Sequence, residues 1–108
     1  RLPLAAERGG RVVGYLMAWR QVDELHILNL AVAPAERRRG TGSRLLAALE
    51  DRAWTLGAAR IVLDARETAL GFYRGHGYTV DGSGPMLFNR IAHVRMSKAR
   101  GGKTVQDR

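Results

Sequence analysis

Three consecutive arginines precede a glycine-rich turn near the middle of the chain, in the run Arg37-Arg38-Arg39-Gly40-Thr41-Gly42. Residues 25–32 before it are strand-forming, and residues 43–49 after it have apolar side chains at helical spacing. A glycine-rich turn that opens a helix presents unpaired backbone N–H groups at the positive end of the helix dipole, which suits phosphate. Arginine adds charge and forked donors for phosphate oxygens. We therefore expect this turn to hold the pyrophosphate of a nucleotide-like cofactor.

Two other kinds of phosphate loop fit the same turn less well. A P-loop needs a lysine and then Ser or Thr after its last glycine, but Gly42 is followed by Ser43-Arg44. The dinucleotide fingerprint needs G-x-G-x-x-G, and Leu45 occupies the third glycine position. Asp64 does follow at about the spacing of the ribose-binding acid. The preceding hairpin and the short chain still weigh against a doubly wound fold.

Length, composition and charge limit the classes of protein. The chain has 108 residues, enough for one domain, and 45% of them are hydrophobic. It has no cysteine, which excludes disulfides, thiolate metal sites and a cysteine nucleophile. No apolar run is long enough for a membrane span and there is no signal-peptide pattern, so we expect a cytoplasmic protein without membrane partners. The net charge is +8, but the basic tail and the three arginines supply much of it, so it need not indicate nucleic acid.

The apolar patterning predicts a mixed α/β fold around one twisted sheet. Residues 2–7 and 12–19 are expected to form a hairpin around Gly9-Gly10, and residues 24–32 a central strand covered on both faces, because both parities are apolar. A helix follows the glycine turn, with a buried stripe at Leu45, Leu46, Leu49, Ala53 and Leu56. The remaining expected elements are a strand at 61–63, a short helix at 69–73, a strand at 78–80, a loop at 82–85, a strand at 91–96 and a flexible basic tail at 99–108.

Three motifs resemble those of the GNAT N-acetyltransferase superfamily. Residues 32–42 are similar to its acetyl-CoA motif, (Arg/Gln)-x-x-Gly-x-(Gly/Ala) after a strand ending in valine, with Arg37, Gly40 and Gly42 at the defining positions. Residues 69–78 resemble the second motif, A-x-x-F-Y-x-x-x-G-(Phe/Tyr). Residues 93–98 resemble H-x-x-M-x-K, the closing strand of one bacterial subgroup. The resemblance extends over residues 24–98.

The resemblance implies a GNAT domain over residues 1–98, with helices on both faces of the sheet. The family's usual first strand and two helices, which form one wall of the acceptor site, are absent from this sequence. It also implies that acetyl-CoA is the cosubstrate, that a primary amine is the acceptor, and that attack is direct in a ternary complex. No metal is expected. An exposed sheet edge left by the absent strand would let two copies pair as a homodimer.

The resemblance also implies which residues hold the cosubstrate. The strand before the turn would offer backbone N–H groups to the acyl arm, and the turn would bind the pyrophosphate. The expected cosubstrate-binding residues are Leu30, Ala31, Val32, Arg37, Arg38, Arg39, Gly40, Thr41, Gly42, Ser43 and Tyr73.

Proton transfer needs a base and an acid. An alkyl amine is mostly charged at neutral pH, so a base must take its proton. His26 is the first candidate, since it has the strand parity of Leu30 and Val32; Glu24 is the second and Asp64 the third. His26 as a hydrogen-bonded structural residue is the alternative. The resemblance implies Tyr73 as the acid for the departing thiolate, with Phe72 in the core, and leaves His93 either structural or lining the acceptor site.

Two other functions remain open. One is a catalytically silent acetyl-CoA-binding domain, because the family's N-terminal elements are absent. The other is a basic nucleic-acid-binding module, which the charge favours. Only 6% of residues are aromatic and no RNP-like or helix-turn-helix pattern is present, which weighs against nucleic acid.

Overall fold

The hairpin expected around Gly9-Gly10 forms one edge of the sheet. The computed structural model describes residues 1–87 and 91–101, and in it β1 (Leu2–Arg8) pairs antiparallel with β2 (Arg11–Gln21). Gly9 and Gly10 have φ of +62° and +79°. Positive φ at both central residues matches a two-residue hairpin turn that suits the twist of the strands. The hairpin prediction is confirmed.

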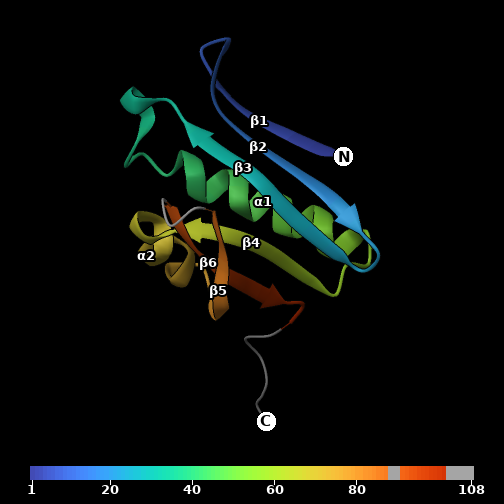
Figure 1. Cartoon of the computed structure of the whole chain (residues 1–108). Helices are drawn as coiled ribbons and strands as arrows, with labels where there is room; N and C mark the ends of the chain where they lie inside the picture. Colours follow the sequence, from blue (N-terminus) through green and yellow to red (C-terminus); the bar gives the residue numbers. More distant parts are fainter. Residues whose placement is uncertain (88–90, 102–108) are drawn as a thin grey trace.

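Six strands form one mixed sheet in the order β1-β2-β3-β4-β6-β5 (Figure 1). The central strand β3 (Glu24–Val32) is antiparallel to β2 and parallel to β4 (Arg60–Arg66). The last strands are β5 (Thr79–Leu87) and β6 (Ile91–Ala99), and β6 lies between β4 and β5. The short 3-10 turns η1 (Pro34–Glu36) and η2 (Glu67–Ala69) precede the helices α1 (Thr41–Thr55) and α2 (Leu70–Gly75). The mixed α/β fold is confirmed.

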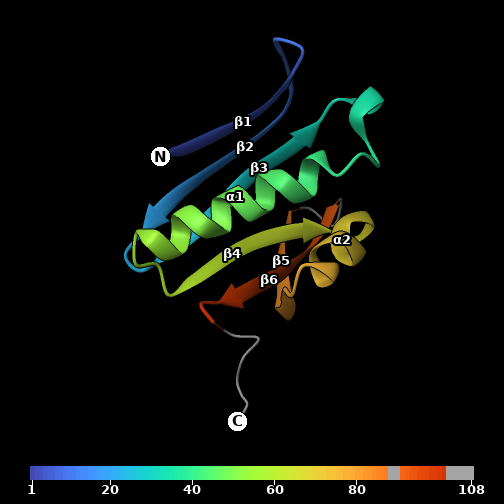
Figure 2. The same ribbon diagram turned by 180° about the vertical axis from the view of Figure 1, so that it is seen from behind.

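The core lies between α1 and one face of the sheet (Figure 2). Leu45, Leu46, Leu49 and Ala53 are buried as the helical spacing predicts. Leu56 is 45% exposed, so its expected place in the stripe is wrong. Leu56 is the C-cap residue just past the last residue of α1, and Gly57 follows in the left-handed conformation with φ +84°, so the helical spacing no longer applies there.

Among the described residues both helices lie on the same face of the sheet, which corrects the expectation of helices on both faces. Tyr73 of α2 belongs to the same buried cluster as the α1 leucines, and a hydrogen bond of 2.9 Å joins Ser43 of α1 to His76. The opposite face carries half-exposed Tyr15 and Trp19 and exposed Leu28. No described element covers it, so β3 is central but is not covered on both faces.

A β-bulge at Leu28 breaks the alternation of β3. Against β2, Met17 pairs with Asn29 but Ala18 pairs with Ile27, so Leu28 is an extra residue. Leu25 and Ile27 are buried in the core before the bulge, whereas Leu30 packs against that core after it. Odd-numbered residues of β3 therefore face α1 before the bulge, and even-numbered residues face it after the bulge. The expectation that His26 shares a face with Leu30 and Val32 is wrong for this reason.

The end of the chain differs in detail from the sequence-based elements. Residues 82–85 belong to β5, where the pairing with β6 has two register shifts, rather than to a loop. β6 continues to Ala99, and the N–H of Arg100 donates to the carbonyl of Ala59 at 2.9 Å. Residues 102–108 of the expected tail lie outside the described residues. No described helix has the length and apolar content to cross a membrane.

The α1 stripe gives a stability prediction with a matched control in the same helix. Replacing fully buried Leu49 with alanine should lower the free energy of unfolding by about 2–5 kcal/mol, because it removes methyl groups from the core and leaves a cavity. The same change at Leu56 should cost less than about 1 kcal/mol. Urea unfolding of both variants measures the difference. Equal losses would contradict this account of the helix.

Candidate functional site

The glycine turn presents its backbone to solvent as a helix N-terminus. Gly40 is the N-cap of α1 and has φ +83°, and Arg38 has φ +67°. From Gly40 onward, the first backbone N–H that donates to a backbone carbonyl is that of Arg44, which bonds to the carbonyl of Gly40 at 3.0 Å. The N–H groups of Gly40, Thr41, Gly42 and Ser43 have no backbone acceptor among the described residues. Unpaired N–H groups at a helix N-terminus are the donors that the expected anion cradle would need.

A buried carboxylate holds this turn in place. Glu36, only 6% exposed, accepts from Arg8 Nε at 2.9 Å, from Arg39 at 3.4 Å and from the Thr41 hydroxyl at 3.4 Å. Burial raises the pKa of Glu36, but the hydrogen bond and charge of Arg8 and the charge of Arg39 outweigh it and hold that pKa below its usual value. Glu36 thus links β1 to both sides of the turn. No sequence motif indicated this role for Glu36.

The parallel pairing of β3 with β4 stops early and opens a cleft. Only residues 24–26 of β3 pair with residues 60–62 of β4, so the later residues of both strands have no partner across this gap. A cavity of about 650 Å³, here called the loop-side cavity, lies at the end of the gap nearest the turn. It is lined by Leu30, Ala31, Val32, Arg37, Gly42, Arg66, Thr68, Ala69, Phe72 and Tyr73.

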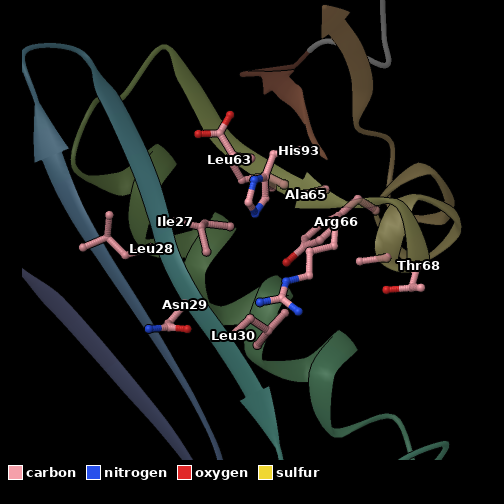
Figure 3. A pocket seen from close by; sticks show the side chains of 12 residues that line it. Ile27, Leu28, Asn29, Leu30, Leu63, Ala65, Arg66, Thr68 and His93 are labelled. Carbon is pink, nitrogen blue, oxygen red and sulfur yellow. The ribbon is translucent and has the colours of Figure 1, made fainter. Parts of the chain in front are cut away.

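A second cavity of about 320 Å³, the strand-side cavity, lies deeper between the diverging strands (Figure 3). Its polar lining residues are Asn29, Asp64, Arg66, Thr68, Tyr73 and His93. Figure 3 shows the His93 ring and the Arg66 side chain reaching into the space between β3 and β4. Tyr73 and Arg66 line both cavities, so the two meet at these side chains.

Tyr73 is buried at the junction of the two cavities. Its ring packs edge-on against Phe72 and Tyr78, with centroids 5.1 and 5.7 Å away. Burial raises its pKa above the usual value, so the phenol keeps its proton at neutral pH. Its hydroxyl has no hydrogen-bond partner among the described residues. The phenol is thus available to a ligand in either cavity.

The structure does not bring all the expected turn residues to a cavity. Arg37 and Gly42 line the loop-side cavity, whereas Arg38 and Arg39 line neither. Thr41 as a whole is only 1% exposed, and the Ser43 hydroxyl is bonded to His76, so neither side chain is available at the turn.

The first two base candidates lie outside both cavities. His26 Nε2 donates to Glu24 Oε1 at 3.0 Å, and Glu24 also lies 3.7 Å from Arg60. The third candidate, Asp64, does line the strand-side cavity. Both of its oxygens accept from Arg95, at 2.6 and 3.1 Å, and this pairing raises the pKa of Arg95.

A model of the acetyltransferase (GNAT) family matches residues 1–78 of the chain. This chain belongs to the GNAT family. It is 35% identical over 81 residues to the uncharacterized N-acetyltransferase YjcF of Bacillus subtilis, a match that covers 74% of this chain and 58% of YjcF. The GNAT chain described here therefore spans little more than half of that relative.

Solved structures agree with this assignment. An acetyltransferase from Bacillus cereus superposes with a TM-score of 0.83 at 28% identity, covering 92% of this chain and 72% of that one. The PaiA N-acetyltransferase of Thermoplasma acidophilum, solved with coenzyme A, gives a TM-score of 0.82 at 19% identity, covering 92% and 60%. The second match concerns the fold alone.

Three residues of this GNAT site had little signal in the sequence. Arg66 and Thr68 follow the short strand predicted at 61–63, but β4 runs to Arg66 and carries them to the cleft. Glu36 adjoins the arginine run, but one of its three partners lies 28 residues earlier, and nothing in the local sequence indicates that its carboxylate is buried. Among the described residues no group of three His, Asp or Glu side chains is arranged to hold a metal.

The charge on Glu36 gives a pH-dependent stability prediction. The pKa of Glu36 is lower in the folded state than in the unfolded chain, where it is about 4.3. The ionised carboxylate therefore stabilises the fold at pH values above about 4.3, and this stabilisation is lost as the pH falls through the folded-state pKa. Glu36→Gln should therefore lower the melting temperature at pH 7, and the gap to wild type should narrow below about pH 4. Glu7→Gln, at an exposed position of β1, is the control and should have little effect. A gap that stays constant from pH 7 to pH 3 would contradict the charge argument.

Proposed function

We propose that this protein is an acetyl-CoA-dependent N-acetyltransferase that moves the acetyl group to a primary amine by direct attack in a ternary complex. The observation that carries the proposal is the meeting of two cavities at Tyr73, one of them ending at the N-terminus of α1. Membership of the GNAT family supports it.

The residues at the turn fit the cosubstrate. A pyrophosphate would accept from the free N–H groups of Gly40 to Ser43, and Arg37 would add charge beside it. A Cβ at position 42 would lie in ordinary contact with Phe72 at 3.5 Å and Val32 at 3.7 Å, so a side chain longer than that of alanine would occupy the loop-side cavity beside the turn. Leu30, Ala31 and Val32 pair with β2 but have no partner on the β4 side, and that side of their backbone would border the acyl arm. Acetyl-CoA supplies an activated acetyl group as a thioester.

Tyr73 would donate a proton to the departing thiolate. Its raised pKa keeps the phenol protonated until the leaving group develops charge. Because the chain has no cysteine, an acyl-cysteine intermediate is excluded, and the amine attacks the thioester itself.

A silent acetyl-CoA-binding domain is the second candidate. It is favoured by the sheet face that no described element covers, since half-exposed Tyr15 and Trp19 and exposed Leu28 lie there. Both candidates predict cosubstrate binding, and only the first predicts turnover. Thiol release from acetyl-CoA with a panel of a polyamine, an aminoglycoside and peptides with free amino groups separates them. The absence of cysteine means that free thiol in this assay comes from coenzyme A alone.

Cosubstrate binding should depend on the backbone cradle. Acetyl-CoA at a hundredfold excess over its Kd should stabilise the fold by about 2.7 kcal/mol, seen as a rise in melting temperature. Acetyl-pantetheine, which lacks the pyrophosphate, should give a much smaller rise. Gly42→Leu should abolish the rise, whereas Gly71→Leu, at a position with open space around its Cβ, should keep it. A full shift in Gly42→Leu would contradict the cradle.

Removing the Tyr73 hydroxyl should separate chemistry from binding. Tyr73→Phe keeps the buried ring but removes the proton donor, so kcat should fall by about 10²–10⁴-fold. The melting shift caused by acetyl-CoA should stay close to that of wild type. Thiol release measures the first quantity and thermal melting the second. Equal losses of turnover and binding would argue that Tyr73 only supports the fold.

A further inference from the structure

The three histidines of this chain have different surroundings. His26 donates to Glu24, and His76 is bonded to Ser43 and packs against Phe72 with ring centroids 4.8 Å apart. Neither of these two rings lines the cavities at Tyr73. His93 lines the strand-side cavity, is partly buried, and has no hydrogen-bond partner among the described residues.

The register of β4 and β6 fixes the side to which His93 points. His93 lies directly opposite Arg66, and Arg95 lies directly opposite Asp64. Opposed residues of an antiparallel pair share a face, and residues two apart in one strand share it too. All four side chains therefore lie on the sheet face that α1 does not cover. His93 reaches the cavity from that face, whereas Tyr73 reaches it from α2.

Packing explains the other two residues of the H-x-x-M-x-K motif. Met96 is fully buried in the core. Lys98 Nζ donates to both oxygens of Glu50 at 3.2 Å and to the carbonyl of His76 at 2.9 Å. Lys98 also borders a separate cavity beside His76, but its side chain is held by these bonds. His93 alone among the three lines the strand-side cavity, and no contact among the described residues explains it.

The other polar side chains of the strand-side cavity are engaged elsewhere or lack a site for a proton near neutral pH. The Asp64 carboxylate is held by two donors of Arg95. Tyr73 is protonated at neutral pH, and Arg66 is a cation that has no acceptor to offer. Asn29 and Thr68 do not titrate in the ordinary range. An imidazole is the side chain best suited to accept a proton near neutral pH.

We propose that His93 is the base that takes the proton from the acceptor amine, directly or through one water. This rests on the proposed function. The imidazole takes one proton from the ammonium group, and the freed nitrogen forms the C–N bond to the acetyl carbon. The C–S bond breaks, and Tyr73 protonates the thiolate. The second proton of the nitrogen restores the Tyr73 phenol through solvent, and His93 releases its proton to water. The amide, coenzyme A and one proton are the products.

The test compares ethylamine with methoxyamine, two small amines of which only the first is charged at pH 7. His93→Gln should lower kcat/KM for ethylamine by about 10²-fold, because the charged amine then lacks its base. The loss in kcat/KM with methoxyamine should be smaller by a factor of about ten or more, since that amine is already neutral. If His93 had only a structural role, the substitution would reduce kcat/KM equally for both amines.

The outcomes separate this proposal from the function on which it rests. If wild type turns over and His93→Gln does so at the same rate, the role of His93 is overturned but the proposed acetyltransferase function stands. A larger and amine-selective loss in His26→Gln would also overturn it. No thiol release by wild type with any amine overturns the acetyltransferase itself, and the acetyl-CoA melting shift then tells whether a silent binding domain remains.

A spectroscopic measurement covers the case in which His93→Gln does not fold. The Cε1 proton signals of the three histidines are assigned through the single His→Gln variants that do fold, and the remaining signal by elimination. Adding coenzyme A together with ethylamine should shift the His93 signal more than that of His26, because only His93 borders the cavity. A His93 signal that stays in place while His26 moves would overturn the proposal.

Discussion

The early end of the parallel pairing between β3 and β4 is the constraint on which the site depends. Three residue pairs hold these strands together, and beyond them neither strand has a partner across the gap. Unpaired backbone groups must bond elsewhere, to water or to a ligand. The bulge at Leu28 accompanies this divergence, and it turns Leu30 and Val32 toward α1. The N-terminus of α1 follows β3 directly, so the free N–H groups of the helix lie at the mouth of the gap.

The turn must also keep several positive charges near one another without an anion bound. Glu36 reduces this repulsion, because its buried carboxylate pairs with Arg39 and with Arg8 from β1. The Thr41 hydroxyl bonds to the same carboxylate, which fixes the first residue of α1. Arg37 has no such partner among the described residues and lines the loop-side cavity. Arg39 therefore supports the shape of the turn and Arg37 borders the loop-side cavity, whereas Arg38 does neither.

The sequence predicted correctly those elements that depend on neighbouring residues. The Gly9-Gly10 hairpin, the glycine turn and the helix after it depend on residues within a few positions, and all three formed. The bulge at Leu28 left no sequence mark, because both parities of β3 are apolar. That single extra residue separated His26 from Leu30 and Val32. Leu56 kept the helical spacing, but the chain turns at Gly57. Gly82 to Pro85 has the composition of a loop, yet pairing with β6 holds it in an edge strand.

The acid and the base proposed for the reaction belong to opposite sides of one sheet. Tyr73 comes from the side that α1 and α2 cover, and His93 from the side that no described element covers. A sheet with complete pairing would keep such side chains apart, because its backbone forms a continuous layer. Where β3 and β4 diverge, that layer is interrupted, and both side chains line the same cavity. A cosubstrate held at the α1 N-terminus and an acceptor arriving over the open face could then meet without competing for one opening, which is what direct attack in a ternary complex requires.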